Sequence, residues 1–461
     1  MTSVASVIAE LQPQLGPKGL LTDVEIANRP AWMGNGGEGS APALLRPAST
    51  DELAAVMRVC HAHGQPVVPQ GGLTGLVRAT VTNEQTLALS LERMNAIESI
   101  DPINRTMTVQ AGVPLQTVQE KAEEHGLMFP LDLGARGSAT IGGNVATNAG
   151  GNRVIRYGMM RENVLGLEAV LADGTVVSSL HPMIKNNTGY DLKQLFIGSE
   201  GTLGIVTRVV LRLRQLPRSQ NVAFVAVPDF QSLTDLLGRI DAALGGTLSA
   251  FEVMWREYYE LVTSAPATNR KPVTTDAPYY VLIESLGSDQ AADEARFEAA
   301  LEEMFEAGVI TDAAIAKSQA EREAIWAMRD DVGQNARHAP IQAFDVSLKL
   351  DDMEAYVAEV NDALQARWPG ATNMVFGHLG DGNLHLITGV GDGSAEARHA
   401  VEEVIYERLR PRGGSVSAEH GIGLEKKPWL SVSRSEPEVA LMRTLKQALD
   451  PKGILNPGKV F

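Results

Sequence analysis

Apolar residues follow either a strand-like or a helix-like spacing along the chain, and the mixture of the two spacings changes near residue 217. Before that point, short runs such as 106–110 have the length and the bounding turn residues of strands. From about residue 221, strand patterns such as 279–284 alternate with longer segments of helical period such as 289–305. The change predicts an α+β protein with more than one domain. The predicted parts are a first domain at 1–217, a second domain at 218–424, and a C-terminal segment at 425–461 that returns to the first domain.

Two stretches of the first domain are too rich in glycine to be ordinary helices or strands. The first follows a short strand and reads Gln-Gly-Gly-Leu-Thr-Gly at 70–75, a loop whose backbone amides can approach a phosphate closely. Taken alone, this loop is more simply explained as an ordinary turn, and it matches neither the Rossmann nor the P-loop pattern. The second stretch, residues 131–151, has six glycines among 21 residues. Close packing of backbone against a flat ligand is the physical use of such glycines.

The second domain contains two histidines on either side of an Asp-Gly turn, within the sequence FGHLGDGNLHL at 376–386. A two-residue hairpin turn there would pair His378 directly with His385, with Cβ atoms roughly 4.5 to 5.5 Å apart. At this separation both imidazoles can bind one divalent metal. Glu419 would complete a His-His-Glu set with one position left open, and His420 is its direct neighbour. Each residue alone has an ordinary structural explanation, but their concentration in two short motifs favours a functional site.

The composition argues against several classes of partner. A formal net charge of −16 would repel nucleic-acid phosphates and anionic membrane surfaces. No run approaches the roughly 18 apolar residues of a spanning helix, and the N-terminal residues are expected to form an amphipathic helix rather than a signal peptide. The single cysteine, Cys60, allows no internal disulfide, so a reducing, cytoplasmic location is expected. Cys60 is predicted to be a packed helix residue rather than a catalytic thiol.

Four further motifs accompany the glycine-rich loop. They are GGNVATNAGG at 142–151, NTGYDL at 187–192, IGSEGTLG at 197–204 and LNPG at 455–458. In this combination the chain resembles the vanillyl-alcohol oxidase/p-cresol methylhydroxylase family of flavoproteins, and within it the D-2-hydroxyacid dehydrogenase group. The resemblance covers nearly the whole chain. It implies a two-subdomain FAD-binding domain of the p-cresol methylhydroxylase type and an α+β substrate domain with an antiparallel sheet.

The resemblance also implies which residues bind FAD. They are Pro69, Gln70, Gly71, Gly72, Leu73, Thr74, Gly75, Ser138, Gly142, Gly143, Asn144, Thr147, Glu200, Gly204, Ile205 and Asn456. Residues 70–74 would hold the pyrophosphate, Glu200 would flank the adenine half, and Asn456 would reach the ring. Relatives with covalent flavin use a histidine or cysteine near these loops. Neither is present here, so non-covalent FAD is expected.

In relatives that share both histidine motifs, the residues matching His378, His385 and Glu419 bind zinc, which implies Zn²⁺ here. The substrate hydroxyl would be acidified by that charge, and His420 would be the base that accepts its proton. The resemblance thus implies oxidation of a D-2-hydroxy acid of the D-2-hydroxyglutarate/D-lactate class to the 2-keto acid, with hydride transfer to flavin N5. An oxygen-using flavin oxidase and a non-catalytic flavin subunit of a larger complex remain the alternatives.

The match weakens at the substrate side chain. Arg329 corresponds to an arginine that relatives use to bind a substrate carboxylate, and a surface helix arginine is the alternative explanation. Dicarboxylate-specific relatives have threonine, lysine and asparagine where an ungapped alignment places Gly333, Ala343 and Ile387. These changes make the pocket more apolar and favour lactate or a larger apolar D-2-hydroxy acid over 2-hydroxyglutarate. The expected electron acceptor is an electron-transfer flavoprotein, a quinone or a cytochrome, and a homodimer is the expected assembly.

Overall fold

The computed structural model describes residues 3–22, 25–26, 29–30, 40–274 and 276–461. The chain divides into two compact units. The first comprises Met1–Gly151, Gly158–Leu216 and Glu419–Phe461, and the second comprises Asn152–Tyr157 and Pro217–Ala418. Two points differ from the predicted division: the chain re-enters the first unit at Glu419 rather than at 425, and the second unit includes the short segment 152–157.

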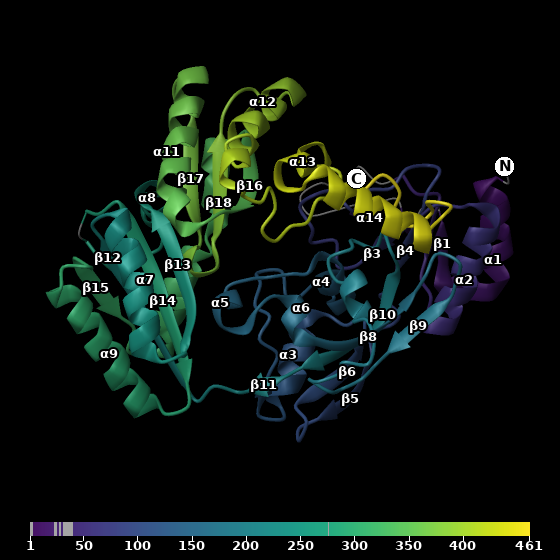
Figure 1. The fold of residues 1–461 in the computed structure, drawn as a ribbon, viewed down its shortest axis with the longest axis horizontal. Helices are drawn as coiled ribbons and strands as arrows, with labels where there is room; N and C mark the ends of the chain where they lie inside the picture. Colours follow the sequence, from purple (N-terminus) through teal and green to yellow (C-terminus); the bar gives the residue numbers. More distant parts are fainter. Residues whose placement is uncertain (1–2, 23–24, 27–28, 31–39, 275) are drawn as a thin grey trace. The chain divides into compact units, whose positions relative to one another are not determined.

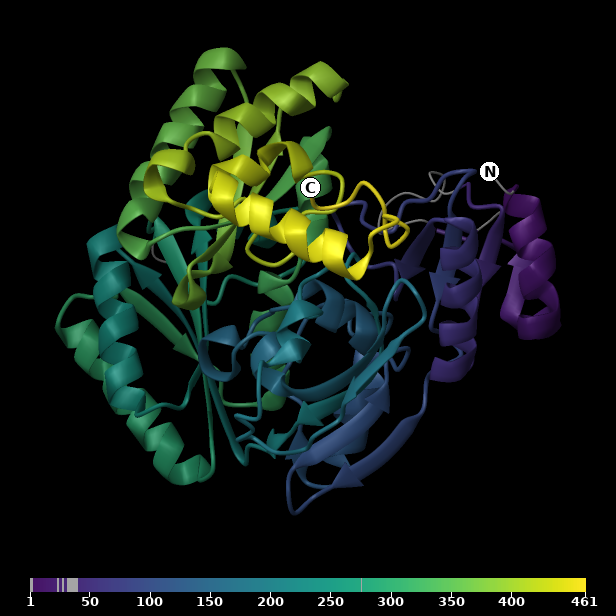
Figure 2. The same cartoon turned by 45° about the vertical axis from the view of Figure 1, so that its right-hand side comes forward.

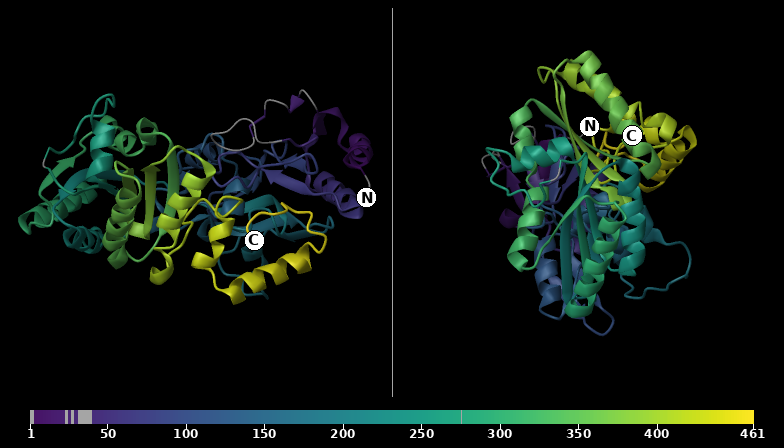
Figure 3. Two further views of the ribbon diagram at one scale, coloured as in Figure 1. Left: turned by 90° about the horizontal axis from the view of Figure 1, so that it is seen from above. Right: turned by 90° about the vertical axis from the view of Figure 1, so that its left-hand side faces the viewer.

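Strands of the first unit form two main sheets (Figure 1). One has the order β1 (Leu20–Thr22), β2 (Ala43–Leu45), β4 (Leu87–Ser90), β3 (Val67–Gln70). The other has the order β5 (Ile97–Asp101), β6 (Thr106–Gln110), β10 (Ile205–Arg212), β8 (Val164–Val170), β9 (Val176–Ser179), and β7 (Leu127–Met128) pairs separately with β11 (Arg214–Gln215). Leu455 of the C-terminal tail, yellow in Figure 3, forms a parallel bridge with Val67. The tail therefore extends the edge of the first sheet.

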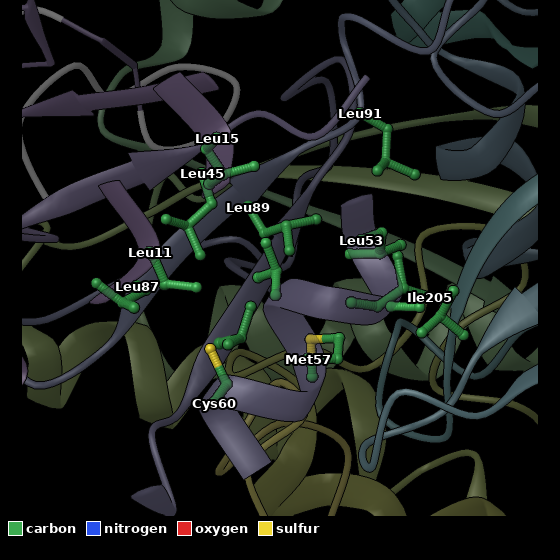
Figure 4. Packing of buried hydrophobic residues seen from close by; sticks show 14 of the residues in the cluster. Leu11, Leu15, Leu45, Leu53, Met57, Cys60, Leu87, Leu89, Leu91 and Ile205 are labelled. Atoms are coloured by element: carbon green, nitrogen blue, oxygen red, sulfur yellow. The ribbon is translucent and has the colours of Figure 1, made fainter. Parts of the chain in front are cut away.

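Helices of the first unit cover these sheets and connect their strands. They are α1 (Val4–Gly19), α2 (Thr50–His63), α3 (Leu115–Glu123), α4 (Ile141–Thr147), α6 (Met160–Asn163), α13 (Leu430–Ser433) and α14 (Glu436–Leu449). Figure 4 shows α2 packing its buried face, which includes Leu53, Met57 and Cys60, against the strand leucines Leu45 and Leu89. Burial raises the pKa of the Cys60 thiol to about 12. Cys60 is thus a packed helix residue, as predicted.

The second unit is built on a seven-stranded antiparallel sheet, which agrees with the expected substrate domain. Its order is β15 (Asp312–Ile315), β12 (Ser219–Val227), β14 (Tyr279–Gly287), β13 (Leu248–Trp255), β17 (Thr372–His378), β18 (Asn383–Gly389), β16 (Ile341–Ser347). Its helices are α5 (Val154–Tyr157), α7 (Phe230–Leu244), α8 (Arg256–Thr263), α9 (Gln290–Glu306), α10 (Gln319–Arg329), α11 (Leu350–Arg367) and α12 (Ala395–Tyr406). Helices α7 and α9 lie side by side (Figure 2), whereas α8 and α10 contribute to the apolar cluster that contains Phe224 and Phe376.

Helix α10 ends at Arg329, because the following Asp-Asp-Val-Gly run has low helix propensity, and a 3₁₀ segment at Val332–His338 follows. Strand β16 ends at Ser347, and Leu350 begins α11. In the described part of the chain, no helix is both long and apolar enough to span a bilayer.

Arg153 attaches segment 152–157 to the sheet of the second unit. Its Nε and Nη2 donate to the two carboxylate oxygens of Glu284 on β14, at 2.8 and 3.1 Å. Glu284 is wholly buried, and Ser249 and Gln220 each donate a further hydrogen bond to it at 2.8 Å. Burial alone would raise the pKa of Glu284, but the Arg153 guanidinium and these hydrogen bonds hold it below its ordinary value. The ion pair keeps a charged carboxylate stable inside the sheet.

Replacing Arg153 with alanine should therefore destabilise the second unit. The change leaves Glu284 buried without its cation, which typically costs about 3–5 kcal/mol of unfolding free energy. Urea unfolding followed by circular dichroism measures the loss. Lys121→Ala, which breaks an exposed ion pair with Glu124 in the first unit, is the control and should leave the transition unchanged. Equal stability of Arg153→Ala and the wild type would contradict the assignment.

Candidate functional site

A pocket with about 720 Å³ of empty space lies in the first unit between the two glycine-rich stretches. Ten of the predicted FAD-binding residues line it: 69–71, 142–143, Thr147, Glu200, 204–205 and Asn456. The other predicted residues, 72–75, Ser138 and Asn144, are not part of its lining.

Buried polar atoms at this pocket lack partners within the protein. Gln70 Oε1 and Asn456 Oδ1 are buried, and neither has a hydrogen-bond partner in the described part of the chain. Asn144 Nδ2, on the adjacent helix α4, is in the same condition. Because such atoms cost free energy unless a ligand or water satisfies them, the site suits a polar ligand. The residues present therefore fit FAD, whose ring, ribose and phosphates offer both donors and acceptors.

Glycine is required where the two predicted cofactor loops touch. A Cβ on Gly72 would lie 1.9 Å from the carbonyl oxygen of Ser138 and 2.9 Å from Ala139 Cα. A Cβ on Gly71 would meet Thr140 Oγ1 at 2.8 Å. Gly72 thus shapes the pocket by allowing the loops to approach, although it does not itself line the pocket.

Glu200 connects the pocket to the segment that carries His420. The residue has a positive φ of 51°, a strained conformation for a side chain other than glycine. Its carboxylate accepts hydrogen bonds from the backbone N–H groups of Ile422 and Gly423 at 2.7 and 2.8 Å. Its carbonyl oxygen accepts one from Asn456 Nδ2 at 2.7 Å. Burial raises the pKa of Glu200, and this carboxylate holds the chain just after His420 rather than facing solvent.

The prediction missed other residues of the pocket. Ala79 and Thr80 line it, and the Gln70 side-chain amide donates to the carbonyl oxygen of Thr80 at 3.1 Å. Neither residue type is distinctive, so only their position shortly after the glycine-rich loop could have indicated them. Phe196 also lines the pocket, and a Cβ on Gly204 would lie 2.6 Å from its ring.

The histidine hairpin has a different register from the predicted one. His385 pairs with Phe376, not with His378, and a short 3₁₀ turn at Leu379–Asp381 joins the strands. The predicted two-residue turn was therefore wrong. His378 and His385 are nevertheless diagonal neighbours on one face of the sheet, with ring centroids 5.3 Å apart.

The carboxylate of Glu419 is the third potential metal ligand beside the two histidines. One ligand atom each from His378, His385 and Glu419 lies within 4.8 Å of the others. Glu419 directly follows a segment fixed to β16, where Ser415 and Ser347 exchange backbone hydrogen bonds and Ser417 donates to Asp345 at 3.4 Å. The two imidazoles and the carboxylate are a donor set that suits zinc with an open position.

Arg329 is a buried residue rather than the surface helix arginine of the alternative explanation. Its Nε donates to Glu252 Oε2 at 2.9 Å, and its Nη2 forms an ion pair with the same oxygen at 2.8 Å. Its Nη2 is also a hydrogen-bond partner of His378 Nε2 at 3.4 Å, and its Nη1 donates to Asp330 at 3.2 Å. Burial alone would lower the pKa of Arg329, but the neighbouring carboxylates raise it above its ordinary value. The guanidinium therefore stays charged, and its Nη1 keeps one further N–H for another acceptor.

Two of the three positions expected to set substrate choice are neighbours in the structure, and the third lies in another segment. Ala343 and Ile387 lie directly opposite each other on β16 and β18, and Ile387 also pairs with Met374. Ile387 packs against the apolar cluster of α8 and α10, on the same face of the sheet as His385. Gly333 is exposed in the 3₁₀ segment after α10. Lys426 is buried near Glu200.

Gly72→Ala should weaken FAD binding about tenfold or more, because the new Cβ forces the two loops apart. The measurement is FAD content after purification, followed by titration of the apoprotein with FAD. Gly134→Ala is the matched control, since a Cβ there meets nothing within 4 Å. Full FAD content in Gly72→Ala would show that the loop contact does not shape the pocket.

Comparisons with known proteins agree with this architecture. Residues 41–179 match the family model "FAD binding domain", and residues 216–460 match "FAD linked oxidases, C-terminal domain". The mitochondrial D-2-hydroxyglutarate dehydrogenase of Bos taurus is 43% identical over 92% of this chain and 77% of its own length. The D-2-hydroxyglutarate dehydrogenase of Xanthomonas citri pv. viticola is 42% identical over 91% of this chain and 89% of its own.

Among solved structures, p-cresol methylhydroxylase with bound substrate superposes with a TM-score of 0.78 at 16% identity, over 99% of this chain and 96% of that chain. At this identity the likeness shows the fold alone. It confirms the expected p-cresol methylhydroxylase type of FAD-binding domain. Together with the family models and the relatives, it shows that the chain belongs to the FAD-linked oxidase family of flavoproteins, in the group that contains the D-2-hydroxyglutarate dehydrogenases.

Proposed function

We propose that the protein is an FAD-dependent dehydrogenase that oxidises a D-2-hydroxy acid to the 2-keto acid with the help of zinc. The observation that carries the proposal is the set of ligand atoms on His378, His385 and Glu419, with His420 as the next residue. A chain that binds FAD without oxidising a hydroxy acid has no need of this arrangement. The names of the relatives favour a dehydrogenase over an oxygen-using oxidase.

The first unit is the part that binds FAD in this proposal. Its orphaned polar atoms on Gln70, Asn144 and Asn456 are the groups that the cofactor would satisfy. When bound, FAD supplies an acceptor for the hydride that leaves the substrate Cα. Non-covalent attachment, a cytoplasmic location and a homodimer stay predictions, as does the choice among an electron-transfer flavoprotein, a quinone and a cytochrome as acceptor.

His378, His385 and Glu419 would hold the zinc, leaving a position for the substrate hydroxyl and carboxylate. A divalent ion there supplies Lewis acidity, which lowers the pKa of a coordinated hydroxyl. His378 suits ligation through Nε2, since its Nδ1–H donates to the buried carboxylate of Glu252 at 2.7 Å. That hydrogen bond fixes the tautomer.

His420 would accept the hydroxyl proton as the general base. Its place in the chain is fixed on the C-terminal side by the hydrogen bonds of Ile422 and Gly423 to Glu200. The substrate loses one proton from its hydroxyl oxygen and one hydride from Cα, and the C–O bond becomes a carbonyl. Proton acceptance by His420 and hydride loss together account for the two hydrogens removed.

Arg329 would bind the substrate carboxylate through the Nη1 hydrogen that its protein partners leave available. The remaining part of the substrate would then extend toward the apolar side chains near Ile387. This arrangement lacks the cation and amide that dicarboxylate-specific relatives place at 343 and 387. Lactate or a larger apolar D-2-hydroxy acid is therefore the substrate we propose.

His385→Ala should remove zinc and activity while FAD remains bound, because the metal loses one of its three protein ligands. Metal analysis and the flavin absorbance spectrum measure the two cofactors separately. Retention of both zinc and turnover would refute the ligand assignment.

His420→Ala should keep zinc and FAD but slow flavin reduction by roughly 10²- to 10⁴-fold, the usual effect of losing a general base. Anaerobic stopped-flow absorbance measures the rate of flavin reduction. An unchanged rate would remove His420 from this role.

Introducing the polar residues of the dicarboxylate-specific relatives should change substrate choice. The double variant Ala343→Lys, Ile387→Asn is expected to raise kcat/KM for D-2-hydroxyglutarate and to lower it for D-lactate, since it restores a cation and an amide. Steady-state kinetics on both acids give the ratio. If the wild type prefers D-2-hydroxyglutarate and the kcat/KM ratio of the variant is unchanged, these positions do not select the substrate.

A further inference from the structure

The interior of the second unit contains a carboxylate that the reaction scheme does not use. Glu252 lies on β13, a strand whose eight residues are all buried. It is 1% exposed, and both of its oxygens are engaged. Oε1 accepts the Nδ1–H of His378 at 2.7 Å, and Oε2 accepts a hydrogen bond from Nε of Arg329 and forms an ion pair with its Nη2. One side chain thus contacts both the predicted zinc ligand and the predicted substrate-binding arginine.

The strand register places these groups together. Glu252 pairs directly with His378 across β13 and β17, so the two side chains lie on the same face. Arg329 is the last residue of α10 and reaches this face from above Phe376, whose ring centroid lies 5.4 Å from its guanidinium carbon. The hydroxyl of Tyr258 donates to the Arg329 carbonyl oxygen at 3.0 Å and fixes the end of the helix.

Charge explains why one acid serves both partners. His378 Nε2, the nitrogen through which this imidazole would bind a metal, is a hydrogen-bond partner of Arg329 Nη2 at 3.4 Å. A divalent cation on that nitrogen and the guanidinium would repel each other at close range. A buried carboxylate between them offsets this repulsion.

We infer that Glu252 is the positioning residue that fixes His378 for zinc binding and Arg329 for binding the substrate carboxylate. The inference rests on the proposed function, because it assigns Glu252 to the same site. Its action is indirect, because it would contact neither metal nor substrate. Glu252 sets the tautomer of His378 and the orientation of the Arg329 guanidinium. Loss of such a partner typically weakens metal affinity by about 10- to 100-fold.

A purely structural explanation is that Glu252 only joins α10 to the sheet. The same sheet provides the comparison that separates the two explanations. Glu284 on β14 is equally buried and is also paired with an arginine, Arg153, but no histidine is among its hydrogen-bond partners in the described part of the chain. If burial of an ion pair were the whole role of Glu252, then Glu252→Gln and Glu284→Gln should have the same consequences.

The experiment compares Glu252→Gln with Glu284→Gln in the full-length, FAD-loaded protein. Zinc dissociation constants come from competition with a chromogenic chelator, and stability comes from urea unfolding. For Glu252→Gln we expect zinc binding about 10- to 100-fold weaker, and KM for D-lactate raised more than kcat is lowered at saturating zinc. For Glu284→Gln we expect lower stability with wild-type zinc affinity and KM.

Glu252→Asp provides a second test if the glutamine variant does not fold. It keeps the charge for the ion pair but is one methylene shorter, so it cannot reach both partners, and zinc affinity should again fall. If the wild type binds zinc and the glutamine and aspartate variants bind it equally tightly, the inference about Glu252 is overturned but the proposed function is not. A wild type that binds no zinc overturns the proposed function, and the inference with it.

Discussion

Buried carboxylates that each join distant segments are the constraint on which both units depend. A carboxyl group inside a protein is stable only when hydrogen bonds or ion pairs satisfy its oxygens. Glu200 in the first unit therefore fixes the backbone after His420, and Glu284 in the second fixes segment 152–157. Glu252 fixes His378 and Arg329. Each acid lies in an otherwise apolar interior, so its partners have little freedom to move.

The two candidate sites differ in how their geometry is produced. At the flavin pocket the backbone determines the shape, because glycines at 71, 72 and 204 let neighbouring segments approach more closely than any Cβ allows. At the histidine site the side chains determine the shape, through strand register and the hydrogen bonds of Glu252. Substitutions should accordingly act differently: added bulk harms the first site, and lost charge harms the second.

Sequence patterns predicted much of this arrangement where the signal is local. Spacing within short segments was enough to predict the strand at 106–110 and the glycine-rich loops at the pocket. It was also enough to select His378 and His385 as a pair. The hairpin register was wrong, because a two-residue turn was assumed where a 3₁₀ turn replaces it. The role of Glu252 could not be predicted, since its partners are 77 and 126 positions away in sequence and a lone glutamate in an apolar strand carries no signal.

The most direct test of the account is anaerobic titration of the FAD-loaded protein with the D and L forms of 2-hydroxy acids, followed by the flavin absorbance near its visible maximum. The account predicts bleaching with a D-2-hydroxy acid but not with its L form, loss of bleaching after zinc is removed by a chelator, and recovery when zinc is returned. Absence of bleaching with every D-2-hydroxy acid, or equal bleaching before and after chelation, would contradict it.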